Sequence, residues 1–216
     1  MKPKFSKDEI YDRLVPALCP PYTHALEYFK GRTAGAEFVV ELGVGTGNIA
    51  KAILSATPTI KYIGLDTSAE SLEKARQKLQ GYTCELRQED FSKALLPNAQ
   101  IYVSSLSSHH LDHEQQNILF RRIHQVCPSF LHFELIAPQS KKEEEENNAY
   151  LKSCASKVAG ELGLSSSDIE AMLEESNKHD KPMTLAEHII QHKSHGVEFD
   201  LLLKDHCFVM YQTLRK

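Results

Sequence analysis

The segment from Phe38 to Asn48 constrains the fold of this chain more than any other. It reads Phe-Val-Val-Glu-Leu-Gly-Val-Gly-Thr-Gly-Asn, an apolar and β-branched run that leads into three glycines. Such a run is typical of a buried parallel strand. Glycines at alternate positions permit a tight turn with positive φ and let a ligand approach the backbone. The segment therefore predicts a strand, a ligand-binding loop and a helix that begins near residue 47.

Two further strands are predicted to end in acidic side chains. Residues 60–65 read as a strand that is followed by Asp66, about twenty residues after the glycines, where α/β nucleotide sites place a ribose-binding carboxylate. Residues 83–88 read as the next strand, which is followed by Asp90 and Phe91. Ligands of open α/β sheets bind beyond the carboxyl ends of the strands. These side chains are therefore predicted to share one edge of the sheet with the glycine loop.

This ordered set of motifs resembles the class I S-adenosylmethionine (SAM)-dependent methyltransferases of the small-molecule branch. The segment from Ile101 to Leu111 adds a likeness to their fourth-strand motif, and the resemblance runs from about residue 11 to the end. It implies an α/β fold with a doubly wound, Rossmann-like seven-stranded sheet that is mostly parallel, with an antiparallel C-terminal strand, an N-terminal helical segment and a helical lid insertion. It also implies SAM as the cofactor and S-adenosylhomocysteine (SAH) as the product.

The resemblance assigns roles to individual residues. Asp66 would hold the ribose, Asp90 the adenine amino group with Glu89 as the competing acid, and Tyr22 would close over the cofactor. The full set of implied cofactor-binding residues is Tyr22, Glu41, Gly43, Gly45, Gly47, Asp66, Thr67, Asp90, Phe91 and Ser105.

A histidine pair follows the predicted fourth strand. His109 is the candidate catalytic base, since an imidazole titrates near neutral pH and can take a proton from a hydroxyl, amine or carboxylic acid. The alternative is a structural role for His109 and its neighbour His110 at the junction of strand and helix. Both remain open, because correct placement of nucleophile, methyl carbon and sulfur supplies much of the rate when the nucleophile is already ionised.

The alternation of strand and helix patterns from residue 38 to residue 136 predicts a parallel sheet with right-handed crossovers. The predicted strands are 38–42, 60–65, 83–88, 100–104 and 129–136, and the predicted helices are 47–56, 68–80 and 112–126, with N-caps at Ser68 and Asp112. We expect one domain with four parts: an N-terminal helical cap over 1–35, a SAM-binding core over 36–140, a helical lid over 141–182, and a C-terminal helix and strand pair over 183–216.

Composition limits the partners and the compartment. The 216 residues suit one domain, and a net charge of −4 gives no broad basic surface for nucleic acid. No apolar run approaches the roughly 20 residues of a membrane span, and no secretory signal is visible. Five scattered cysteines without a C-x-x-C pair are read as reduced thiols of a cytoplasmic protein. We expect a small-molecule substrate, no membrane and no nucleic acid, and a homodimer stays open.

A metal site is not expected. The chain has eleven histidines, but no H-E-x-x-H spacing and no cysteine pair supports them. His188 and His192 are four residues apart on a predicted helix, and such a pair is expected at the surface.

Three functions are weighed. The first is a SAM-dependent methyltransferase that transfers a methyl group to an oxygen or nitrogen of a small molecule. The second is another SAM-using enzyme such as a relative of the carboxy-SAM synthases, which the absence of arginine from residues 150–175 disfavours. The third is a non-catalytic SAM- or SAH-binding regulatory protein. Neither an Asn/Asp-Pro-Pro-Tyr motif nor a Pro-Cys pair follows the fourth strand, which argues against methylation of amino groups of adenine or glutamine and of cytosine C5.

Overall fold

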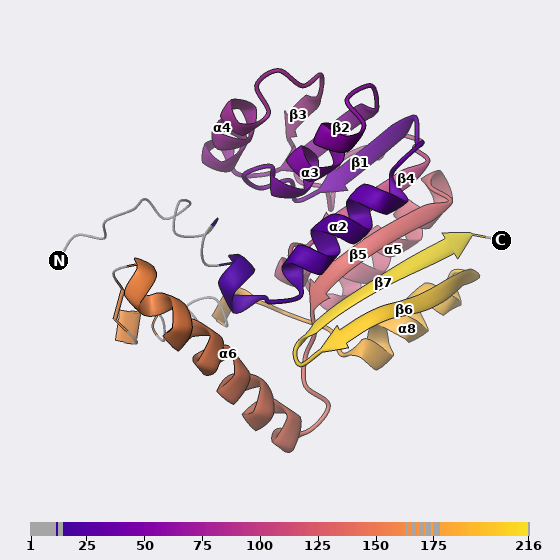
Figure 1. Cartoon of the computed structure of the whole chain (residues 1–216). Coiled ribbons are helices and arrows are strands. Elements are labelled where there is room, and N and C mark those ends of the chain that lie inside the picture. The colour runs from indigo at the N-terminus through magenta and orange to yellow at the C-terminus, as the bar shows by residue number, and fades with distance from the viewer. Residues whose placement is uncertain are drawn as a thin grey trace.

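A computed structural model describes residues 12, 15–162, 164, 165, 167, 168, 171, 174 and 178–215. In this part of the chain one seven-stranded sheet has the order β3-β2-β1-β4-β5-β7-β6 (Figure 1). Its strands are β1 (Phe38–Leu42), β2 (Lys61–Asp66), β3 (Glu85–Gln88), β4 (Ile101–Ser105), β5 (Ser129–Leu135), β6 (Val197–Asp205) and β7 (Phe208–Arg215). Strands β1 to β5 are parallel, and β7 runs antiparallel to both β5 and β6. The predicted mostly parallel sheet with an antiparallel C-terminal strand is confirmed.

The helices connect these strands. They are α2 (Tyr22–Arg32), α3 (Asn48–Ala56), α4 (Ala69–Lys78), the 3₁₀ turn η1 (Ser108–His110), α5 (His113–Val126), α6 (Lys141–Leu162) and α8 (Leu185–Ser194). Two predicted starts are explained by side-chain caps: Ser68 accepts a hydrogen bond from the Ser71 amide, and Asp112 forms a capping box with Gln115. The first part of the predicted N-terminal helical cap over 1–35 lies mostly outside the described residues.

The sheet is covered on both faces by apolar side chains. Neighbouring residues of β1 point to opposite sides, so Val39 joins the core under α2, α3 and α4, whereas Val40 joins the core under α5. Figure 1 shows α2 and α3 on one side of the sheet and α5 and α8 on the other. Both faces are therefore buried, as a parallel sheet requires.

Helix α6 contacts the sheet at the β6–β7 strand pair. The Tyr150 ring stacks on His206 in the turn between β6 and β7, with 3.7 Å between ring centroids, and its hydroxyl donates to Asp205 at 3.2 Å. Lys204 of β6 pairs with Glu143 at 2.7 Å. These contacts attach α6 to the β6–β7 turn. None of the described helices is both long and apolar enough to cross a bilayer.

Candidate active site

The loop between β1 and α3 holds three glycines in the left-handed region. Gly43, Gly45 and Gly47 have φ of +73°, +51° and +84°, values that other residues rarely adopt. A Cβ on Gly43 would stand 2.4 Å from the Cβ of Ser107, whereas nothing lies within 4 Å of a Cβ on Gly45. Gly43 thus permits close packing against the residues after β4, and Gly45 leaves its backbone open to a ligand.

A cavity of about 440 Å³ lies beside this loop. Its volume falls in the range of about 300–1,000 Å³ that is usual for small-molecule sites. The wall is built from the connections that follow β1, β2, β3 and β4, at the carboxyl edge of the parallel strands. The lining residues are Gly43, Gly45, Thr46, Asp66, Thr67, Ser71, Asp90, Phe91, Ser105, Leu106, Ser107, His110 and Leu111.

Asp66 stands at the end of β2 with its carboxylate fixed by two backbone amides. Its Oδ2 accepts from the amide of Gly45 at 2.8 Å, and its Oδ1 accepts from the amide of Ser68 at 2.9 Å. These bonds hold an acceptor group on the cavity wall between the glycine loop and the start of α4. Each carboxylate oxygen has further lone-pair capacity for a hydroxyl donor.

Asp90 and Phe91 form the wall after β3. Asp90 Oδ1 accepts from the hydroxyl of Ser92 at 2.6 Å and from its amide at 3.0 Å, and Lys93 lies 3.1 Å from the other oxygen. The Ser92 hydroxyl and the nearby Lys93 lower the pKa of Asp90 despite partial burial, so the carboxylate is ionised at neutral pH. Phe91 is 9% exposed and presents an apolar surface to the cavity.

A smaller recess of about 30 Å³ adjoins the same loop and is lined by Tyr22 and Glu41 among others. Glu41 is 1% exposed, and its Oε2 accepts from the hydroxyl of Tyr62 at 2.5 Å. Burial raises the pKa of Glu41 to about 8, since the Tyr62 hydrogen bond opposes the shift only in part and the charge of Asp66 adds to it. Glu41 is therefore protonated in most molecules at pH 7.

His109 is buried within η1, and only 7% of it is exposed. Its Nδ1 lies 2.5 Å from Oε1 of Glu134, and its Nε2 lies 3.8 Å from Oδ1 of Asp180. Burial alone lowers the pKa of His109, but the charge of Glu134 and the hydrogen bond to it outweigh burial, so the pKa is raised. The amide and hydroxyl of Ser108 donate to the other oxygen of Glu134 at 2.9 Å and 2.6 Å.

The structure brings the predicted site residues to this cavity and its recess, with the exception of Gly47 and His109. Gly47 packs against α4, where a Cβ on it would stand 3.3 Å from the Cβ of Ala75. The cavity wall contains His110, whose side chain is 59% exposed, and does not include His109. The reason is the tight η1 turn, which sends His109 inward to Glu134. Two residues before η1, Leu106 adopts a positive φ of 49°.

No described residue of the predicted lid, 141–182, lines the cavity. Tyr150 of this segment is stacked on His206 in the turn between β6 and β7. A lid role for this segment stays a prediction.

Two features of the site escaped the sequence analysis. Asp12 of the N-terminal segment accepts hydrogen bonds from Thr46, from Asn48 at 3.0 Å and from Lys78 at 2.7 Å, so it ties this segment to the glycine loop. The second is Glu134. An acid in the middle of the apolar run of β5 was a visible signal, because buried carboxylates need partners.

The expectation for the i, i+4 histidine pair was wrong. His188 and His192 are both 0% exposed and face the sheet from α8. The expectation rested on the frequent surface position of such histidine pairs, whereas the buried side of α8 is formed by these two imidazoles.

Comparison with known proteins agrees with this geometry. Residues 39–129 match the sequence model of a methyltransferase domain. An uncharacterised methyltransferase of Oceanobacillus iheyensis is 36% identical over 90 residues, which are 41% of this chain and 40% of that protein. The chain thus matches about two-fifths of the length of this relative.

Solved structures share the fold. Magnesium protoporphyrin IX methyltransferase from Synechocystis PCC 6803, solved with bound SAH, superposes with a TM-score of 0.66 and 12% identity over 96% of this chain and 94% of that one. Human N-acetylserotonin methyltransferase, solved with SAM, gives a TM-score of 0.58 and 16% identity over 95% of this chain and 57% of that one. Residues 39–129 thus match a methyltransferase domain by sequence, and the fold of the chain is shared with methyltransferases solved with SAM or SAH.

Proposed function

We propose that this chain is an enzyme that binds SAM in the 440 Å³ cavity and transfers its methyl group to an oxygen or nitrogen of a small molecule. One observation carries the proposal: the glycine loop, Asp66 and Asp90 converge on a single cavity at the carboxyl edge of the parallel strands. The sequence match of residues 39–129 to a methyltransferase domain and the SAM- and SAH-bound structures with the same fold support it.

The cavity offers each part of SAM a matching surface. The open backbone at Gly45 and the carboxylate of Asp66 suit the ribose, because amides and carboxylates can bond its hydroxyls. Asp90 can accept from the adenine amino group, and Phe91 can pack against the ring. Glu41 in the adjoining recess is placed for the amino acid end, with Tyr22 beside it. Thr67 and Ser105 complete the wall.

Bound in this cavity, SAM supplies an electrophilic methyl group on sulfur. The chain contributes position and, at the acceptor side, a base. Glu134 accepts from Nδ1 of His109, which leaves Nε2 as the nitrogen that can take a proton. We assign the base to His109, whose ring centroid lies 4.2 Å from that of the cavity-lining His110. Alignment of the acceptor with the methyl group supplies the remainder of the rate enhancement.

The acidic pair after β3 gives a direct test. Asp90 lines the cavity and its chain neighbour Glu89 does not. We expect Asp90→Ala to weaken SAM binding by roughly 10-fold or more, the effect of losing a hydrogen bond to a charged group, and Glu89→Gln to leave it unchanged. Isothermal titration calorimetry with SAM measures both.

The controls separate binding from folding. Circular dichroism and thermal melting should give the two variants the same fold as the wild type. Equal affinities for Asp90→Ala and the wild type would contradict the assigned cavity. SAM binding without methyl transfer to any of a panel of phenols, amines and carboxylic acids would instead favour a non-catalytic binding protein.

A further inference from the structure

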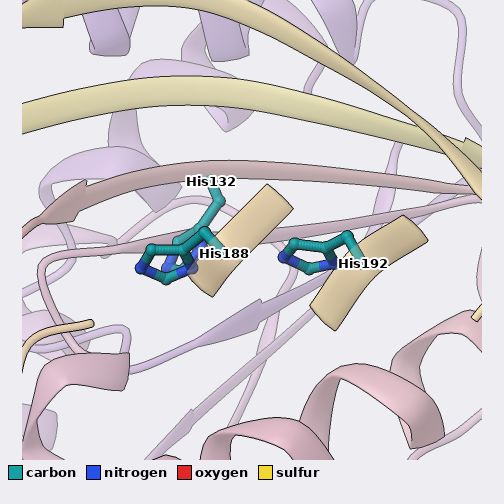
Figure 2. A group of neighbouring side chains, drawn as sticks. All are labelled: His132, His188 and His192. Atoms are coloured by element: carbon teal, nitrogen blue, oxygen red, sulfur yellow. The ribbon is translucent and has the colours of Figure 1, made fainter. Parts of the chain in front are cut away.

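A second polar cluster lies away from the cavity, on the face of the sheet that α8 covers. His132 of β5 and His188 and His192 of α8 are each 0% exposed. Figure 2 shows the three imidazoles together, with His188 and His192 on successive turns of one helix and His132 reaching them from a strand. None of them lines the cavity. The cluster is therefore separate from the proposed SAM site.

One nitrogen of each imidazole is directed at the same oxygen. The hydroxyl of Tyr211 lies 2.5 Å from Nδ1 of His132, 2.9 Å from Nε2 of His192 and 3.1 Å from Nδ1 of His188. The β5–β7 register explains part of this convergence, since it pairs His132 directly with Tyr211. Four potential ligand atoms from β5, β7 and α8 thus meet at one buried point.

The spacing suits a four-coordinate ion. Zinc bound tetrahedrally at about 2.0–2.1 Å from each ligand holds its ligand atoms about 3.3 Å apart. The Tyr211 oxygen already lies within 2.5–3.1 Å of all three nitrogens, and one ligand atom from each histidine lies within 4.8 Å of the others. A shift of roughly 1 Å in the side chains would bring these atoms to ligand distance of a central ion.

The outward nitrogens of two histidines are held by further partners. Nε2 of His132 lies 3.2 Å from Oε2 of Glu134, and Nδ1 of His192 lies 2.8 Å from Nε2 of His124. Metal-binding histidines characteristically have their second nitrogen bonded to a carboxylate or another polar group, which fixes the tautomer and the ring orientation. Glu134 also places a negative charge beside the cluster, which offsets the cost of burying a cation.

We propose that His132, His188 and His192 bind a divalent transition metal ion of the zinc class, with the Tyr211 oxygen as the fourth ligand. Three imidazoles favour such ions over magnesium or calcium, which prefer oxygen ligands. A buried site with four protein ligands is typical of a structural metal site. The ion would fasten α8 to β5 and β7 at the parallel–antiparallel junction of the sheet.

A competing site must be separated from this one. His109, His110 and Asp180 also place ligand atoms within 4.8 Å of one another, at the edge of the cavity. His110 is half exposed and therefore easily substituted. The variant His110→Gln distinguishes the two sites, and exposed His24 gives the control for nonspecific binding to surface histidines.

The full chain, freed of metal by a chelator and returned to chelator-free buffer, is titrated with Co²⁺ and followed by visible absorption between about 500 and 700 nm, where tetrahedral Co²⁺ absorbs strongly. We expect one Co²⁺ per chain, displaced by Zn²⁺, with the same spectrum in His110→Gln and His24→Gln. His188→Gln should weaken binding by at least about 100-fold, because loss of a ligand exceeds the effect of losing an outer partner. Tyr211→Phe should retain binding with an altered spectrum.

Circular dichroism establishes that each variant is folded, and a rise in Tm on adding Zn²⁺ to the wild type but not to His188→Gln gives a second readout. Three outcomes would overturn the proposal: no stoichiometric Co²⁺ binding, unchanged binding by a folded His188→Gln, or a spectrum that is lost in His110→Gln. If His188→Gln fails to fold, His192→Gln takes its place in the same comparison.

Discussion

At the scale of single residues, the partners of two buried acids, Glu41 and Glu134, decide whether each is ionised. Burial raises the pKa of Glu41 to about 8, and the hydrogen bond from the Tyr62 hydroxyl opposes this rise only in part. Burial raises the pKa of Glu134, but its contacts with His109 and His132 outweigh burial and hold the pKa well below its usual value. One buried acid is thus largely neutral and the other is charged, and the two differ in what they can do for a ligand.

Glu41 predicts a pH dependence of cofactor binding. The amino group and sulfonium of SAM are positively charged, so binding favours the ionised form of Glu41. Below the pKa of about 8 a proton must leave when SAM binds, and the affinity should rise with pH, by up to about 10-fold per pH unit between pH 6 and 7. Calorimetric titration of the wild type and of Glu41→Gln with SAM at several pH values measures this dependence. Equal pH slopes in the two proteins would show that Glu41 is not the group that titrates.

The His109–Glu134 pair predicts a second titration. The raised pKa of His109 depends on the charge of Glu134, while burial pulls the pKa the other way. We expect NMR titration to give His109 a lower pKa in Glu134→Gln than in the wild type, because only the smaller effect of the Asp180 charge then opposes burial. An unchanged His109 pKa in the variant would remove Glu134 from the proposed role of orienting the base.

At the scale of elements, local signals were sufficient for most of the fold. The strand before the glycines was predicted at 38–42 and is β1 with the same bounds, and the helix predicted at 112–126 begins one residue later. These predictions succeeded because the β-branched run, the glycine turn and the Asp112 cap all act within a few residues. The four strand connections that form the cavity follow from that order.

Contacts between distant segments could not be predicted in this way. His132 meets Tyr211 only through the β5–β7 register, across 79 positions. His109 turns inward because Glu134, 25 positions away, accepts a hydrogen bond from its Nδ1. No short-range pattern carries such pairings, so the sequence analysis chose His109 for the acceptor side, whereas the cavity wall contains His110.

At the scale of the whole molecule, the cavity and the histidine cluster occupy different parts of the sheet. The carboxyl edge of β1 to β4 carries the cavity, and the N-terminal segment reaches its glycine loop through Asp12. The histidine cluster lies between β5, β7 and α8. Glu134 contacts both regions, since it bonds His109 through one oxygen and His132 through the other.

The central claim is that the cavity beside the glycine loop holds SAM. The most direct measurement is a crystal structure of this chain grown with SAH. The account predicts SAH in the 440 Å³ cavity, with its ribose hydroxyls on Asp66, its adenine against Phe91 with the amino group at Asp90, and its amino acid end toward Glu41. An empty cavity at millimolar SAH, or SAH bound elsewhere on the molecule, would contradict it.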